Sequence, residues 1–330
     1  MHILIVKLGA IGDVLRTTSI LEGLAQKYPG SSIDWLTLPS GREVLLKNRY
    51  IRQIFIWEDR QSLEKYDLVI GLEDEKEVCG LVSEVASGEI QGAYAKGGKI
   101  VYTPSAWFDM SAISKYGLVQ ANILKQKNRK TFQQHMADLL GIEVGHYVFG
   151  LTPDEVEYGR KIVKNWGLGT KEKIIGINTG AGKRWQLKAL RVETTIDLVK
   201  MVKNKLGVAS VILGGEDEEK RNAIIAKETG MPNGGIHSLR QFASIINRCG
   251  ALVSSDSLAM HFGIALQKKL VVFFGPTSSA EIELYGLGEK ICPAMDCLVC
   301  YKKSCDKKTN CMDEIKTQAL FDTLKRVYNT

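Results

Sequence analysis

The sequence predicts an α/β fold built on parallel sheets. Short apolar stretches rich in β-branched residues alternate with stretches whose apolar residues recur at helical spacing, which is typical of βαβ units. Several of the expected strands end in polar turns that contain glycine, and open α/β sheets bind ligands at such strand ends. A length of 330 residues favours two domains over one. We therefore expect two successive Rossmann-like halves with a cleft between them.

The expected strands of the first half cover residues 2–6, 33–38, 54–57 and 66–72. Between the first two lies a helix over residues 14–28, which Asp13 would cap and Pro29–Gly30 would end. Gly9 and Gly12 do not form a dinucleotide fingerprint, because their spacing is G-x-x-G and no acidic residue ends the second strand. An NAD site is therefore disfavoured.

Residues 73–148 show a less regular pattern. A turn is expected at Lys96–Lys99 and a helix from Thr131. Trp107–Met110 is either core or part of a surface that meets a large acceptor. His135 is expected to be a solvated helix residue.

A domain boundary is expected near Gly150. Thr152 can cap a helix with Pro153 at its first position and Glu155 at its third, which is a capping-box arrangement. The expected strands of the second half cover residues 174–178, 209–213, the stretch that ends before Asp256, and 270–274. We therefore expect domains over residues 1–151 and 152–314.

Asp256 and Ser257 follow a buried strand and stand where helix-capping residues belong. The free amides at such a helix start bind phosphate well. An ordinary helix cap explains an isolated Ser-Asp-Ser equally well. Similar turns at residues 9–13 and near residue 180 favour the ligand-binding interpretation.

Composition excludes several classes of protein. The chain is 45% hydrophobic, and no apolar run reaches the roughly 18 residues of a membrane span. The first residues predict a strand rather than a signal peptide, so we expect a cytoplasmic protein. The net charge of +7 is concentrated locally at residues 125–130 and 302–308. No nucleic-acid module is evident, so small anions or lipid headgroups are the expected partners.

Taken in order, the motifs resemble those of the heptosyltransferase-type glycosyltransferases, family nine, which have the GT-B fold. The resemblance covers nearly the whole chain. The segments that carry it are Gly12–Leu15, Asn178–Gly182 with Lys188 and Glu193, Leu213–Gly215 with the acidic residues after it, Ser255–Ser257 with His261, and Phe274–Thr277.

The resemblance implies an acceptor-binding first domain, a nucleotide-sugar-binding second domain and a last helix, 315–330, that joins the first domain. It implies an inverting displacement that needs no catalytic cofactor or metal. Asp13 would be the general base and Lys188 the cation that stabilises the diphosphate leaving group. Gly12 and Arg16 would lie on the acceptor side. The expected donor-binding residues are Thr179, Gly180, Lys183, Arg184, Glu218, Asp256, Ser257, His261 and Thr277.

Three positions depart from the family pattern. Leu258 replaces a glycine, Ala189–Leu190 replaces an Arg-Trp pair, and Gly71 replaces an aspartate that often ends the fourth strand. Because of these changes, the motifs do not identify the donor sugar, and heptose is only the best-known donor sugar of the family.

Five cysteines lie within residues 292–311. Cys297, Cys300, Cys305 and Cys311 could supply four thiolates to a structural zinc or iron ion, with Cys292 to spare. Similar cysteine tails occur in relatives. Reduced thiols and disulfides are the alternatives, although a cytoplasmic location disfavours disulfides.

The leading hypothesis is a transferase that moves a sugar such as heptose from an ADP-linked donor to a lipopolysaccharide-core or other glycan or glycolipid acceptor. The basic residues would help it approach the anionic inner face of the cell membrane. The alternatives are a sugar-nucleotide epimerase or hydrolase of GT-B architecture and a non-enzymatic metal-linked binding module.

Overall fold

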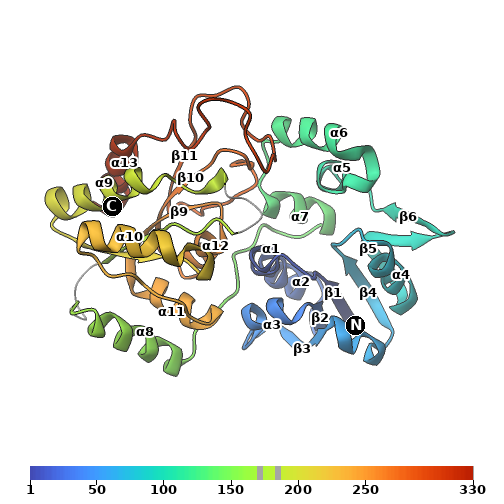
Figure 1. The fold of residues 1–330 in the computed structure, drawn as a ribbon. Coiled ribbons are helices and arrows are strands. Elements are labelled where there is room, and N and C mark those ends of the chain that lie inside the picture. The colour runs from blue at the N-terminus through green and yellow to red at the C-terminus, as the bar shows by residue number, and fades with distance from the viewer. Residues whose placement is uncertain (169–173, 183–186, 330) are drawn as a thin grey trace. The chain divides into compact units, whose positions relative to one another are not determined.

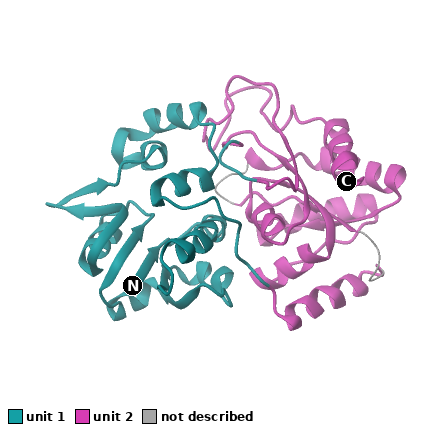
Figure 2. Cartoon of the chain, turned by 180° about the vertical axis from the view of Figure 1, so that it is seen from behind, with its two compact units in different colours: residues 1–150, 280–283 teal, residues 151–279, 284–330 magenta. Residues whose placement is uncertain are grey.

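A computed structural model describes residues 1–168, 174–182 and 187–329 (Figure 1). The chain forms two compact units (Figure 2). The first contains residues 1–150 and 280–283, and the second contains residues 151–279 and 284–330. The main division at residue 150 lies one residue from the expected boundary.

The first unit is built on a six-stranded sheet of order β3-β2-β1-β4-β5-β6, parallel except for the β5–β6 pair. The strands are β1 (His2–Val6), β2 (Ser32–Thr37), β3 (Ile51–Ile56), β4 (Tyr66–Gly71), β5 (Ala86–Lys96) and β6 (Lys99–Tyr102). Ile3 to Val6 are fully buried, as expected of a central parallel strand covered on both faces. The helices are α1 (Ile11–Thr17), α2 (Leu21–Lys27), α3 (Pro39–Leu45), α4 (Lys76–Val85), α5 (Ala106–Ser111), α6 (Ile113–Lys127) and α7 (Phe132–Leu140).

The less regular stretch contains the only antiparallel pair of the described sheets. Lys96 pairs with Lys99 across a tight turn in which Gly97 and Gly98 have φ of 58° and 77°. Two consecutive positive φ angles are what such hairpin turns require, and glycine adopts them without strain. The expected turn is confirmed.

Two predictions for residues 105–140 are decided by burial. Trp107, Phe108 and Met110 are 9% exposed or less, so Trp107–Met110 belongs to the core. The expectation of a solvated His135 is wrong, because its side chain is 3% exposed and its ring packs 5.8 Å from that of Trp107. Helical spacing alone did not show that α7 packs on α5.

The second unit is built on a five-stranded parallel sheet of order β11-β10-β9-β7-β8. The strands are β7 (Ile174–Asn178), β8 (Ala209–Leu213), β9 (Cys249–Ser255), β10 (Lys269–Phe273) and β11 (Gly288–Ile291). The helices are α8 (Pro153–Asn165), α9 (Val192–Met201), α10 (Glu219–Thr229), α11 (Leu239–Arg248), α12 (Leu258–Ala265) and α13 (Thr317–Asn329). Two parallel-dominated sheets confirm the predicted α/β class.

The capping box before α8 is confirmed. The hydroxyl of Thr152 accepts from the amide of Glu155 at 3.3 Å, and the Thr152 amide donates to the Glu155 carboxylate at 2.7 Å. Both contacts use backbone amides that a helix start leaves without partners.

The last helix belongs to the second unit, which corrects the expectation that residues 315–330 join the first domain. Helix α13 packs on α9 and on strands β9 to β11. Its buried side chains Leu320, Leu324 and Val327 recur at helical spacing and complete the core of that unit. An apolar stripe predicts that a helix packs on something, but it does not say on which sheet.

In each sheet the order of the strands reverses at one place, which is called the topological switch point. The reversal lies between β1 and β4 in the first unit and between β7 and β9 in the second. Open α/β sheets bind ligands beside such places, where neighbouring connections leave the carboxyl ends of the strands toward opposite sides. None of the described helices is long and apolar enough to cross a membrane.

Candidate active site

The first strand-end cluster consists of residues 7–13, which follow β1, and Glu73, which follows β4. One oxygen of the Glu73 carboxylate, Oε1, accepts from Lys7 Nζ at 2.7 Å and from the amides of Leu8 and Gly9 at 2.8 and 3.2 Å. Both charged side chains of the ion pair are 13% exposed. Hydrogen bonds to a charged acceptor are stronger than neutral ones, so Glu73 fixes the path of the turn.

Asp13 lies in the first turn of α1, directly after Gly12. The helix begins at Ile11 with Ala10 as its N-cap, so the expected capping role of Asp13 is wrong. Its side chain is 36% exposed, and Oδ1 lies 3.0 Å from a guanidinium nitrogen of Arg16. The carboxylate is therefore held in position on one side and accessible on the other.

Arg16 is held by aromatic rings. Its guanidinium carbon lies 4.4 Å from the ring centroid of Phe132 and 5.3 Å from that of Trp107. A second nitrogen lies 4.0 Å from the carboxylate of Glu281, in the segment 280–283 that belongs to the first unit. Arg16 is 11% exposed and pairs with Asp13 within the fold, and its expected place on the acceptor side stays a prediction.

Sequence analysis did not identify Glu73 or Glu281 as part of this cluster. Glu73 stands two residues after Gly71, where the family often has an acidic residue at the strand end, so a signal was present. Glu281 comes from the stretch between β10 and β11, and no local pattern connects it to Arg16.

The second strand-end cluster consists of Asn178–Gly180, Lys188 and Ser254–Ser257. The side-chain nitrogen of Asn178 lies 3.0 Å from the carbonyl of Gly180 and 3.1 Å from the hydroxyls of both Ser254 and Ser257. The two serine hydroxyls are 3.0 Å apart. An amide with two hydrogens shares them among three acceptors, so the ends of β7 and β9 are bound into one network.

Lys188 is the cation of the second cluster. Its ammonium group donates to the main-chain carbonyl of Asp256 and lies 3.4 Å from the Asp256 carboxylate. The two side chains are 11% and 19% exposed. Ser257 is the N-cap of α12 and accepts no capping hydrogen bond from the described residues. A cation beside uncapped helix amides is suited to holding a phosphate group.

The polar groups of Thr179 are paired within the fold. Its hydroxyl lies 2.5 Å from Asn222 Oδ1 and 3.2 Å from the carbonyl of Leu213, and its amide donates to the same carbonyl at 2.9 Å. Both donors are therefore used inside the fold, and the side chain is 5% exposed. Thr179 therefore holds β7 to β8, and its expected contact with the donor stays a prediction.

Glu218 joins two glycine turns. One carboxylate oxygen accepts from the amide of Gly215 at 2.9 Å, and the other is 3.4 Å from the amide of Ala181. Each oxygen keeps a lone pair for a further donor such as a sugar hydroxyl. The expected contact of Glu218 with the ribose stays a prediction.

The remaining donor-side residues differ in what the structure places around them. His261 is 5% exposed in the second turn of α12 and therefore supports the helix start. Thr277 is 6% exposed, and its buried hydroxyl has no hydrogen-bond partner among the described residues. Buried hydroxyls usually have a partner, so Thr277 is suited to a ligand or water contact. Lys183 and Arg184 lie outside the described residues.

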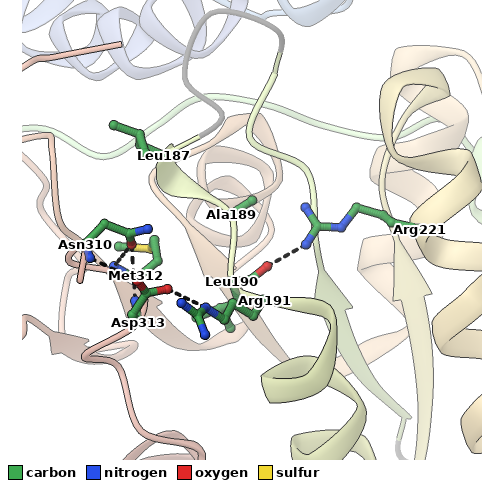
Figure 3. Close-up of a pocket in the computed structure, with 8 residues that line it drawn as sticks. All are labelled: Leu187, Ala189, Leu190, Arg191, Arg221, Asn310, Met312 and Asp313. Atoms are coloured by element: carbon green, nitrogen blue, oxygen red, sulfur yellow. Dashed lines mark hydrogen bonds and ion pairs between the residues drawn. The ribbon is translucent and has the colours of Figure 1, made fainter. Parts of the chain in front are cut away.

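A pocket of about 280 Å³ adjoins the segment that carries Lys188 (Figure 3). Arg221 donates to the carbonyl of Leu190, and Arg191 pairs with Asp313 at 2.5 Å. These two contacts anchor the residues directly after Lys188 to α10 and to the loop before α13. They hold in place the segment of chain that follows Lys188.

The cysteine-rich loop does not form a metal site in this structure. All seven cysteines are described and none is in a disulfide. Among the described residues, no three His, Cys, Asp or Glu side chains converge as ligands. The expected zinc or iron site is unsupported.

The cysteine-rich loop instead supports the turn that contains Thr277 through hydrogen bonds. The amides of Val299 and Tyr301 donate to the carbonyls of Gly275 and Pro276 at 3.0 and 2.9 Å. The side chain of Cys311 packs so close to Gly275 that no Cβ would fit there. Glycine at this position is therefore required by packing.

Two Rossmann-like units with polar clusters at their switch points are typical of sugar-transferring enzymes of the GT-B class. The sequence profile of glycosyltransferase family 9 (heptosyltransferase) matches residues 60–311. The chain therefore belongs to this family and is a glycosyltransferase. No curated protein matched the chain.

Solved structures with the same fold cover almost the entire chain. A family 9 glycosyltransferase from Veillonella parvula DSM 2008 is 17% identical, with a TM-score of 0.79 over 99% of this chain and 97% of its own. The E. coli ADP-heptose lipopolysaccharide heptosyltransferase II is 16% identical, with a TM-score of 0.70 over 100% and 99%. The E. coli heptosyltransferase WaaC with ADP-2-deoxy-2-fluoro heptose is 18% identical, with a TM-score of 0.62 over 99% of each chain. At these identities the similarity shows the fold alone.

Proposed function

We propose that this chain is an inverting, metal-independent glycosyltransferase that moves a heptose from an ADP-linked donor to a hydroxyl of a lipopolysaccharide-core acceptor. The family supplies the reaction class. The donor and acceptor follow from the names of the structural relatives, which include heptosyltransferases with ADP and with an ADP-heptose analogue. The first unit would bind the acceptor, and the second would bind the donor.

One observation carries the chemical part of the proposal. Each sheet places a complementary group at its switch point: an accessible carboxylate, Asp13, in the first unit and a nearly buried cation, Lys188, in the second. In the proposed reaction the acceptor oxygen attacks the anomeric carbon as Asp13 takes its proton, and the bond to the diphosphate oxygen breaks.

The departing diphosphate gains negative charge in the transition state. Lys188 and the first amides of α12 would stabilise that charge more than they stabilise the bound donor, so they would raise the rate rather than only the affinity. Glu218 would accept from the ribose hydroxyls, and Thr277 would contact the donor with the hydroxyl that has no partner in the described fold.

The test is a transfer assay with purified chain, ADP-heptose and a deacylated core oligosaccharide. We expect ADP release that depends on acceptor, a product one heptose heavier and an inverted anomeric configuration by NMR. Chelation of divalent cations should leave the rate unchanged. Consumption of donor without acceptor would instead support the epimerase or hydrolase alternative. No turnover with a panel of sugar nucleotides and acceptors would contradict the proposal.

A further inference from the structure

Exposed apolar side chains gather on α6 of the first unit, the helix that carries this label in Figure 1. Of the ten large apolar side chains exposed in the described part of the chain, five belong to this helix. They are Ile113, Tyr116, Leu118, Val119 and Ile123, with exposed fractions of 39% to 76%. Soluble surfaces rarely carry contiguous apolar residues at this density without a partner.

The helix orders these residues into a stripe. Gly117 has φ of 80° and interrupts the regular helix, so the stripe begins at Val119, and the exposed Leu118 lies about 100° round the helix from it. Val119, Ile123 and Lys127 then follow one another at intervals of four and lie on one face. Ala121, on the other side of the helix, is fully buried. One face of α6 is therefore attached to the unit, and its apolar face is left to solvent.

Helix α6 and the loop after it carry only positively charged side chains of their own, while Asp74 accepts from the Ser114 hydroxyl at 2.6 Å near the start of the helix. Residues 110–137 contain no Asp or Glu, whereas Lys115, Lys125, Lys127, Arg129 and Lys130 are all cationic. Asp109 pairs with Lys115 at 2.5 Å and Asp138 with Lys130 at 2.7 Å. Arg129 donates to the carbonyls of Gln126 and Asn128, which leaves its charge intact. The positive charge is thus concentrated at the carboxyl end of α6.

We propose that α6 docks this chain on the surface of an anionic lipid bilayer. Leu118, Val119 and Ile123 would enter the boundary between headgroups and acyl chains, and Lys127 and Arg129 would contact lipid phosphates. This combination of an apolar face and bordering cations is what an interfacial helix requires. A nucleic acid would not require the aliphatic stripe.

Helix α10 provides an internal comparison. It also exposes an isoleucine, Ile224, which is 52% exposed between Lys220 and Lys227. However, Glu219 and Glu228 lie beside those lysines, and Glu216 to Glu218 precede the helix. An anionic bilayer would repel this segment, so α10 is a matched control.

The test is co-sedimentation of the full chain with phosphatidylcholine vesicles, with and without about one third phosphatidylglycerol. We expect binding to the anionic vesicles only, and weaker binding at roughly 0.5 M salt because the charges are screened. The assay contains no donor or acceptor, so its outcome is independent of the proposed transfer reaction.

Two variants locate the docking face. Leu118→Ser/Val119→Ser/Ile123→Ser should lower the partition coefficient at least tenfold, since each buried apolar side chain contributes substantially. Lys127→Gln/Arg129→Gln should lower it about fivefold for each charge. The control Lys220→Gln/Ile224→Ser/Lys227→Gln should bind like the unmodified chain.

Equal binding to neutral and anionic vesicles would overturn the proposal. So would unchanged binding of the charge variant, whose substitutions are at exposed positions and do not disturb the core. Self-association of the chain through α6 without vesicle binding would show that a second copy, not a bilayer, covers the stripe. Melting curves of all variants exclude unfolding as the cause of any loss.

Discussion

The two strand-end clusters occupy the same topological position in their sheets but are built from opposite chemistry. The first is organised around the carboxylates of Asp13 and Glu73. The second is organised around neutral amide and hydroxyl groups and the ammonium of Lys188. A switch point therefore supplies a crevice, and the side chains that follow the strands decide what the crevice can do.

The accessibility of the central charge also differs. Asp13 is 36% exposed, whereas Lys188 is 11% exposed. A group that accepts a proton from an incoming molecule must be reachable. A group that stabilises developing charge acts more strongly when water is excluded and its position is fixed in advance. The following substitutions test that division of roles, from the largest expected effect to the smallest.

Asp13→Asn should lower kcat by about two to four powers of ten, the usual scale for loss of a general base. The amide keeps the size of the side chain, so the melting temperature should change little. The measurement is steady-state ADP release. Glu84→Gln, at an exposed carboxylate of the same unit, is the control and should leave kcat unchanged. Near-normal turnover of the Asp13 variant would show that Asp13 is not the general base.

Lys188→Met should lower kcat by about two to three powers of ten, because one transition-state donor is lost while the aliphatic stem is kept. Single-turnover rates at saturating donor separate this effect from weaker binding. Lys200→Met, on the exposed side of α9, is the matched control. A change confined to KM would indicate that Lys188 binds donor and transition state equally.

Glu73→Gln should affect both stability and rate. The loss of charge-assisted hydrogen bonds to Lys7 and two amides should reduce the free energy of unfolding by about 1–3 kcal/mol. Urea unfolding measures the first effect, and kcat should fall because the turn that carries Asp13 loosens.

Glu75→Gln removes an exposed carboxylate two residues away and is the control for Glu73→Gln. Equal stability of the two variants would show that Glu73 does not hold the β1–α1 turn. A stability loss with unchanged kcat would separate the structural role of Glu73 from any influence on Asp13.

The smallest expected effect is the pH dependence of stability caused by His135. Its ring packs on Trp107, which contacts Arg16 of the first cluster. Burial lowers the pKa of His135, and the nearby Lys130 lowers it further. The folded state therefore disfavours the protonated ring, so the free energy of unfolding should be highest above the unfolded pKa of about 6.5 and fall as pH drops below it. Urea midpoints at neutral and mildly acidic pH should show this slope, and His135→Gln should flatten it.

His2→Gln, at the exposed start of β1, should keep the slope of the unmodified chain. If both histidine variants have the same pH dependence, burial of His135 is not its origin.

Sequence patterns within a few residues predicted the strands, turns and helix starts well. The apolar run at β1, the paired glycines of the β5–β6 hairpin and the capping box at Thr152 each depend on neighbours within a few residues, so sequence was sufficient. The candidate residues Asp13, Lys188, Asp256 and Glu218 could be located from their motifs. Their roles stay predictions.

The contacts of those residues could not be predicted in the same way. Glu73 and Glu281 reach the first cluster from distant parts of the chain, and Thr179 turns inward to Asn222. The exposed stripe of α6 was also missed, because Trp107–Met110 appeared to be the candidate surface and proved to be core.

The sequence by itself determined the alternation of strands and helices, the family and the polar residues at the strand ends, because each of these is encoded in short stretches of chain. Only the tertiary structure decided that α13 completes the second unit, that one carboxylate holds the turn before Asp13, and that Thr179 turns inward to Asn222. The reason is that such contacts join residues far apart along the chain, and their geometry depends on how whole elements pack.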